Sequence, residues 1–130
     1  MTRKKVLVVD DSAAVQLMVK VALPKDRFEV VTASDGHAGI VKALSEKPDL
    51  ILMDVEMPKL NGFEAVRVLR AQELTRKVPV VMLTSKSEMQ SVATAYQCGC
   101  NGYVHKPFDG PALLAKVSAL LGVPGAVVAA

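Results

Sequence analysis

The chain has 130 residues, of which 51% are hydrophobic and only 4% aromatic, and its formal net charge is +3. This length and apolar content suit one compact domain, and every apolar run is too short for a membrane span or a secretion signal. Scattered basic residues without aromatic stacking platforms argue against a nucleic-acid partner. We therefore expect a cytoplasmic protein with no membrane contact, either monomeric or weakly dimeric.

Five apolar runs rich in Val, Ile and Leu predict strands near residues 6–9, 28–33, 50–53, 78–83 and 102–104. The runs lack polar alternation, which is typical of parallel strands that are buried on both faces of a sheet. The stretches between them are amphipathic and long enough for crossover helices. The sequence therefore predicts an α/β fold, a doubly wound parallel sheet of five strands with five helices.

Short polar residues mark the expected helix starts, because their side chains can accept hydrogen bonds from the first free backbone N–H groups. In chain order, the N-cap candidates are Ser12, Asp35, Asn61, either Ser85 or Ser87, and Asp109. In the third expected helix, Phe63, Val66 and Leu69 recur at helical spacing and should face the core. Arg67 and Arg70 of that helix are then expected to face solvent.

Polar side chains stand at the ends of four of the predicted strands. They are Asp10, Asp11, Asp54, Thr84 and Lys106. In an open parallel sheet, functional groups gather at the carboxyl ends of the strands, where the strand order reverses. The sequence thus predicts an acidic pocket that also holds a lysine and a hydroxyl group.

The three carboxylates of this pocket point to a metal ion. Clustered carboxylates raise one another's pKa unless a cation neutralises them. Oxygen ligands without a His or Cys partner, and with room for waters, favour Mg²⁺ over a closed calcium cage. We expect Asp11 and Asp54 to bind Mg²⁺ directly and Asp10 to bind it directly or through water. The backbone carbonyl of Glu56 would complete the protein's ligands.

The same pocket suits a phosphoryl group, because phosphoryl transfer is catalysed mainly by positioning and charge neutralisation. Asp54 would be the nucleophile and would form an acyl phosphate, a covalent role that carboxylates take in other proteins. Lys106 would pair with one phosphoryl oxygen, and the Thr84 hydroxyl would donate to another.

The ordered set of residues resembles the receiver domain of bacterial two-component response regulators, of the stand-alone chemotaxis and twitching-motility type. The matching residues are Asp10 and Asp11, Asp54 followed by Met57 and Pro58, the Asn61-Gly62 turn, Thr84, and Tyr103 with Lys106, Pro107 and Phe108. This resemblance implies a receiver domain over residues 1–122 with a short tail at 123–130. It also implies a flavodoxin-like strand order, 2-1-3-4-5, and a cis peptide bond before Pro107.

The resemblance further implies a phosphorylation-dependent switch that is not an enzyme and catalyses only its own phosphorylation and dephosphorylation. A sensor histidine kinase or phosphotransfer protein would donate a phosphoryl group to Asp54, after which Thr84 would move toward it and Tyr103 would turn inward. The face made by the fourth helix, the fifth strand and the fifth helix would then bind a downstream protein. After Gly122 the sequence is too short for an output domain, so we expect output through a partner unless the chain is part of a longer regulator.

Two other classes compete with this interpretation. A Mg²⁺-dependent phosphatase or phosphotransferase would use an aspartyl nucleophile on a related sheet, but the usual second aspartate, two residues later, is here Glu56. No cap-like insertion follows it. The other class is a receiver-like interaction module that is never phosphorylated, against which the complete residue set argues.

The remaining reactive residues carry weaker expectations. Cys98 and Cys100 are too close for ordinary disulfide geometry and lack a second ligand pair for zinc, so we expect them to be packed as small residues. His37 and His105 belong to no motif and are expected at the surface. The resemblance places Glu56 and Lys86 on either side of the mouth of the pocket, where they would either shield the phosphoryl group or form a surface pair worth under about 1 kcal/mol.

Overall fold

The computed structural model describes residues 3–84 and 99–123. It contains the strands β1 (Lys4–Val9), β2 (Phe28–Ala33), β3 (Leu50–Asp54), β4 (Val80–Thr84) and β5 (Gly102–His105). They form one sheet in the order β2-β1-β3-β4-β5, and all neighbouring strands are parallel. The predicted fold class and strand order are confirmed. The fourth strand starts two residues later than expected, after Pro79, which has no backbone N–H to offer a neighbouring strand.

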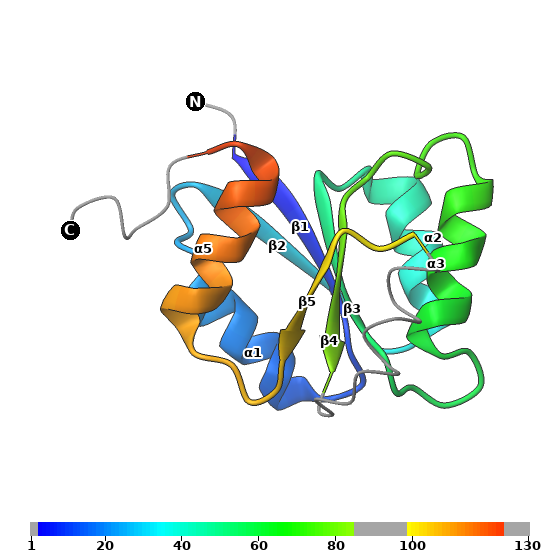
Figure 1. The fold of residues 1–130 in the computed structure, drawn as a ribbon, viewed down its shortest axis with the longest axis horizontal. Coiled ribbons are helices and arrows are strands. Elements are labelled where there is room, and N and C mark those ends of the chain that lie inside the picture. Colours follow the sequence, from blue (N-terminus) through cyan, green and yellow to red (C-terminus); the bar gives the residue numbers. More distant parts are fainter. Residues whose placement is uncertain (1–2, 85–98, 124–130) are drawn as a thin grey trace.

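The described helices are α1 (Ala13–Ala22), α2 (Gly36–Glu46), α3 (Gly62–Ala71) and α5 (Gly110–Leu121). Helices α1 and α5 cover one face of the sheet, and α2 and α3 cover the other (Figure 1). The expected fourth helix, with its caps at Ser85 or Ser87, falls on residues outside the described ranges. None of the helices in the described part of the chain is long and apolar enough to cross a membrane.

All four described helices begin at the predicted caps. The side chains of Ser12, Asp35, Asn61 and Asp109 each accept a hydrogen bond from the backbone N–H three residues later. At α3 the Glu64 side chain also accepts from the backbone N–H of Asn61, which completes a reciprocal capping box. Capping thus fixes where α1 and α3 start relative to the strand ends that precede them.

The sheet separates two hydrophobic cores, because successive side chains of a strand point to opposite faces. In β1, Leu7 and Val9 pack under α2 and α3, whereas Val6 and Val8 pack under α1 and α5. The two faces are therefore filled by apolar side chains. Polar groups that serve a function can gather where the strands end.

Arg70 does not face solvent, contrary to the prediction from helical spacing. Its guanidinium donates hydrogen bonds to the backbone carbonyls of Gly99, Thr75, Arg76 and Val78 and to the side-chain oxygen of Asn101. Partial burial lowers the pKa of Arg70 from its usual value. Helical spacing gives the direction of the Cβ atom, but a long side chain can still bend back along the protein surface to acceptors in the following loop. Arg67, by contrast, is exposed as predicted.

Arg70→Met is expected to lower the free energy of unfolding by about 2 kcal/mol, because several carbonyls lose a charged donor at once. Arg70→Lys should recover little of this loss, since an ammonium cannot reproduce the planar fork of donors. Arg67→Met is the matched control and should change stability by less than about 0.5 kcal/mol. Urea denaturation of the three variants measures the difference, and equal losses for Arg67→Met and Arg70→Met would contradict the assignment.

Candidate functional site

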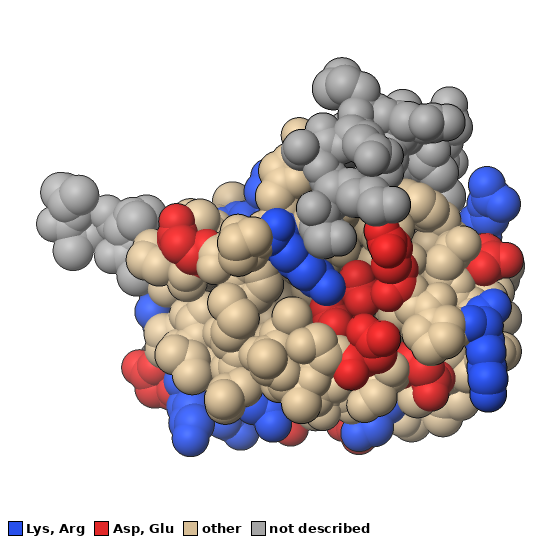
Figure 2. All heavy atoms as spheres, turned by 90° about the horizontal axis from the view of Figure 1, so that it is seen from below, with Lys and Arg blue, Asp and Glu red and all other residues tan. Residues whose placement is uncertain are grey.

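The predicted polar residues meet at the carboxyl ends of the strands. Asp10 follows β1, Asp54 ends β3, Thr84 ends β4 and Lys106 follows β5. Seen from this end, acidic side chains gather around a hollow with a basic side chain at its edge (Figure 2). Asp10, Asp54 and Thr84 are buried, whereas Asp11 is exposed. The structure thus brings Asp10, Asp11, Asp54 and Lys106 together, as the sequence predicted.

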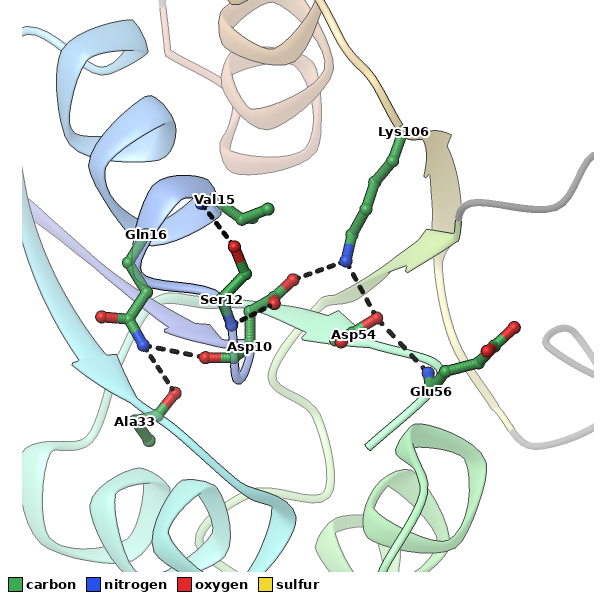
Figure 3. A network of polar contacts seen from close by, with 8 residues as sticks. All are labelled: Asp10, Ser12, Val15, Gln16, Ala33, Asp54, Glu56 and Lys106. Carbon is green, nitrogen blue, oxygen red and sulfur yellow. Dashed lines mark hydrogen bonds and ion pairs between the residues drawn. The ribbon is translucent and has the colours of Figure 1, made fainter. Parts of the chain in front are cut away.

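An ammonium group joins two of the buried groups. The Lys106 Nζ atom lies 2.7 Å from Oδ2 of Asp10 and 3.1 Å from Oδ1 of Asp54 (Figure 3). The other Asp10 oxygen, Oδ1, accepts a hydrogen bond from the backbone N–H of Ser12. Oδ1 of Asp54 also accepts from the backbone N–H of Glu56 at 3.3 Å. Lys106 therefore fixes the two carboxylates relative to each other.

The charges of the site are incompletely balanced. Burial and, to a lesser degree, the nearby Asp10 carboxylate raise the pKa of Asp54 to about 6, even though Lys106 and the Glu56 N–H oppose the rise. Burial by itself lowers the pKa of Lys106, but its contacts with Asp10 and Asp54 outweigh this effect and leave it above the usual value. One lysine thus does not fully offset the desolvation of the Asp54 carboxylate.

The donor set fits a hard divalent cation. Asp10, Asp11 and Asp54 each offer a carboxylate oxygen, and these oxygens lie within 4.8 Å of one another. Oδ2 of Asp10 is buried and lacks a well-directed hydrogen bond, although the Lys106 ammonium is in ion-pair contact with it. A buried carboxylate oxygen with spare acceptor capacity, next to an under-neutralised Asp54, is the environment that a small cation stabilises. The ligand role of the Glu56 carbonyl stays a prediction.

The loop after β3 is held close to Asp54 by a glycine. A Cβ atom at Gly62 would overlap the backbone carbonyl oxygen of Asp54, so only glycine fits there. The Gly62 N–H donates to the carbonyl of Val55 at 2.9 Å. The Asn61-Gly62 pair was recognised in the sequence as a turn, but this close approach to the candidate phosphoacceptor was not predicted.

Thr84 and Tyr103, the predicted switch residues, lie on neighbouring strands. The carbonyl of Thr84 accepts a hydrogen bond from the backbone N–H of Lys106 at 2.7 Å. Tyr103 is half-buried, and its ring forms a T-shaped contact with the ring of His105, with 5.2 Å between ring centroids. His105 is exposed as expected, yet its contact with Tyr103 was not predicted.

Three smaller predictions have mixed outcomes. The Lys106-Pro107 bond is cis, as the resemblance implied. Cys100 is buried, which agrees with a packing role. Cys98 and Lys86 lie outside the described residues, so both the Cys98 prediction and the Glu56–Lys86 pair remain predictions.

Comparison with known proteins gives a consistent result. The chain is 41% identical over 118 residues to the alkaline phosphatase synthesis transcriptional regulatory protein PhoP of Bacillus subtilis, covering 91% of this chain and 48% of that protein. It is 37% identical to the DNA-binding dual master transcriptional regulator RpaA of Synechocystis, covering 90% of this chain and 48% of RpaA. The chain therefore spans about half the length of these curated relatives.

Solved structures match over nearly their whole length. Chemotaxis protein CheY4 of Vibrio cholerae superposes with a TM-score of 0.86 at 35% identity, covering 91% of this chain and 98% of CheY4. The receiver domain of sensor histidine kinase PA1611 from Pseudomonas aeruginosa, solved with magnesium in its active site cleft, gives a TM-score of 0.84 at 30% identity, covering 93% and 99% of the two chains. The family model of the response regulator receiver domain matches residues 6–118, and the chain belongs to this family.

Proposed function

We propose that this chain accepts a phosphoryl group on Asp54 in a Mg²⁺-dependent reaction and thereby switches a surface that a partner protein reads. The observation that carries the proposal is the arrangement of Lys106 between the buried carboxylates of Asp10 and Asp54, with Asp11 beside them. It combines a nucleophile, a metal-ligand set and one fixed cation in a single pocket. The magnesium found in the PA1611 receiver domain supports the choice of ion.

The chemistry follows from these positions. A carboxylate oxygen of Asp54 attacks phosphorus, and the bond from phosphorus to the donor's imidazole nitrogen or acetyl oxygen breaks, with the electron pair leaving on the donor. Bound Mg²⁺, held by Asp10, Asp11 and Asp54, would supply charge neutralisation for the phosphoryl oxygens. The Lys106 ammonium is already within 3.1 Å of Asp54 Oδ1 and can pass to a phosphoryl oxygen with little movement. The reaction modifies the protein itself, so we propose no turnover of an external substrate.

Intact-mass spectrometry after incubation with acetyl phosphate and Mg²⁺ tests the proposal. We expect one added phosphoryl group on the wild-type chain, which EDTA prevents and Asp54→Asn abolishes, because the amide is not nucleophilic. Asp35→Asn is the matched control, since Asp35 is an exposed helix cap. An adduct of equal yield on Asp54→Asn would contradict the assignment of Asp54. Release of inorganic phosphate from a simple phosphomonoester would instead favour the phosphatase alternative.

An apolar surface next to the pocket suits a histidine-bearing partner helix. Leu17, Met18 and Val21 of α1 are exposed, and with Ala22, Phe108 and Gly110 they line a groove. Phe108, which helps to line this groove, lies two residues after Lys106 in the chain. We propose that a sensor histidine kinase or phosphotransfer protein docks there with its histidine facing Asp54.

Leu17→Lys is expected to slow phosphotransfer from a purified histidine kinase that phosphorylates the wild-type chain by about tenfold or more, since a charge enters the apolar contact. Phosphorylation by acetyl phosphate should stay unchanged, because a small donor needs no docking surface. Val41→Lys, at an exposed apolar position of α2 on the other face, is the control. An equal effect of Leu17→Lys on both donors would count against docking at α1.

The output side of the proposal rests on β5 and α5. Tyr103 lies on β5 two strands from Asp54, and a new dianionic group can reorder neighbouring side chains through charge-assisted hydrogen bonds. The fourth-helix part of the proposed face lies outside the described residues. We propose a protein partner in a chemotaxis or motility pathway, following the likeness to CheY4, and a cytoplasmic location, where phosphoryl donors are formed.

A further inference from the structure

The side chain of Gln16 connects the start of α1 with the ends of two strands. Its Nε2 atom donates to the backbone carbonyl of Asp10 at 2.8 Å (Figure 3). Longer contacts of the same nitrogen reach the carbonyl of Ala33 at 3.5 Å and the hydroxyl of Ser34 at 3.4 Å. An amide nitrogen carries two hydrogens, so one can serve Asp10 while the other is shared by the two longer contacts.

The carbonyl that Gln16 holds belongs to the peptide bond between Asp10 and Asp11. This unit is planar, so fixing its oxygen limits the rotation of the whole plane and sets the direction in which the chain leaves toward Asp11. Asp10 has further anchors, because its carboxylate contacts both the Ser12 N–H and Lys106. Among the described residues no hydrogen bond or ion pair is formed by the exposed Asp11 carboxylate, so its placement depends on the backbone.

We propose that Gln16 is a positioning residue for the metal site, whose amide holds the Asp10-Asp11 peptide so that the Asp11 carboxylate is directed at the ion. This inference rests on the proposed magnesium binding and adds a residue that does not touch the metal. Mg²⁺ requires near-octahedral geometry with short ligand distances, whereas Ca²⁺ accepts irregular coordination. Loss of the Gln16 amide should therefore weaken Mg²⁺ binding more than Ca²⁺ binding.

Gln16→Met tests this, because it keeps the side-chain length and removes both N–H donors. Dissociation constants for Mg²⁺ and Ca²⁺ are measured on the unphosphorylated protein by NMR titration of backbone amides. Groups that orient metal ligands typically change affinity by about 10- to 100-fold, and for this indirect contact we expect an increase of about three- to tenfold in the Mg²⁺ dissociation constant. The Ca²⁺ constant should change less. Ser34→Ala removes only the 3.4 Å contact and should leave both constants as in wild type.

A purely structural role for Gln16 predicts a different result. If the amide only held α1 against the sheet, Gln16→Met would lower the melting temperature and weaken the binding of Mg²⁺ and of Ca²⁺ by the same factor. Gln16→Glu is a second variant of nearly the same shape that also cannot donate. Its added charge attracts both cations, but the dissociation constant for Mg²⁺ should still rise relative to that for Ca²⁺.

The outcomes separate this inference from the proposed function. An unchanged Mg²⁺ to Ca²⁺ ratio in both Gln16 variants would overturn the positioning role while leaving magnesium binding by the wild-type protein intact. Absence of Mg²⁺ binding by the wild-type protein would overturn the metal site itself, and the role of Gln16 with it.

Discussion

Lys106→Met is expected to slow phosphorylation of Asp54 by acetyl phosphate about 100- to 1,000-fold, the usual effect of removing one fixed donor from a site where negative charge develops. Within the described residues, Lys106 is the only basic side chain in contact with both Asp10 and Asp54. Without it, the incoming phosphoryl oxygens lose a cation that the fold has already placed. A time course of intact mass at saturating Mg²⁺ measures the rate.

The same substitution should also destabilise the protein. Lys106 is only 18% exposed, and its removal leaves the buried carboxylates of Asp10 and Asp54 to repel each other. Losing one partner of a buried ion pair lowers the free energy of unfolding by about 3 kcal/mol at pH 7. Rates are therefore compared under conditions in which circular dichroism shows the variant to be folded.

Two control variants separate charge from shape. Lys116→Met on α5 changes an exposed lysine and should leave the phosphorylation rate as in wild type. Lys106→Arg keeps the charge but presents a planar fork that does not match a point contact between two carboxylates, so we expect an intermediate rate. A folded Lys106→Met protein that reacts as fast as wild type would remove Lys106 from the proposed chemistry.

The sequence was sufficient to predict the sheet and the convergence of the strand ends. Apolar runs without alternation require burial on both faces, and parallel strands bring their carboxyl ends to one edge. This is why Asp54 and Lys106, which are far apart in the chain, could be placed in one pocket before any contact was known. The caps at Ser12 and Asn61 were equally predictable, because capping is a local interaction.

The features that sequence reasoning missed involve the reach of polar side chains. Helical spacing assigned Arg70 to solvent, although its guanidinium returns to carbonyls in the loop beyond α3. Gln16 belongs to no sequence motif, and its contact with Asp10 depends on how α1 packs against β1 and β2. The extent of Asp54 burial likewise depends on packing between segments distant in sequence. Such contacts and burial are set by tertiary packing and not by the periodicity of the sequence.

Asp54→Asn is expected to raise the free energy of unfolding of the metal-free protein by about 1–3 kcal/mol at pH 7. The folded protein holds the Asp54 proton more tightly than the unfolded chain does, since its pKa is about 6 instead of 3.8. The difference of 6 − 3.8 = 2.2 units corresponds to about 3 kcal/mol as an upper limit. The asparagine avoids this cost while keeping an oxygen that can accept from Lys106.

The sign of the pH dependence provides the sharper test of this prediction. Because the folded state binds more protons between pH 4 and 6, the Asp54 contribution to stability falls as pH rises through that window and is flat above it. Asp54→Asn should lack this fall, whereas Asp35→Asn, at an exposed helix cap, should retain it. Urea denaturation across this range measures the slopes, and identical slopes for wild type and Asp54→Asn would contradict a raised pKa.

Magnesium should reverse the order of stability of the wild type and Asp54→Asn. An ion that binds only the folded state stabilises it by about 2.7 kcal/mol at a concentration of 100 times its dissociation constant. The wild type, with all three carboxylates, should gain this stability at pH 7, whereas Asp54→Asn should gain less because one ligand has lost its charge. The carboxylate at position 54 thus destabilises the metal-free protein. The same buried negative charge favours the binding of a cation and then of a phosphoryl group.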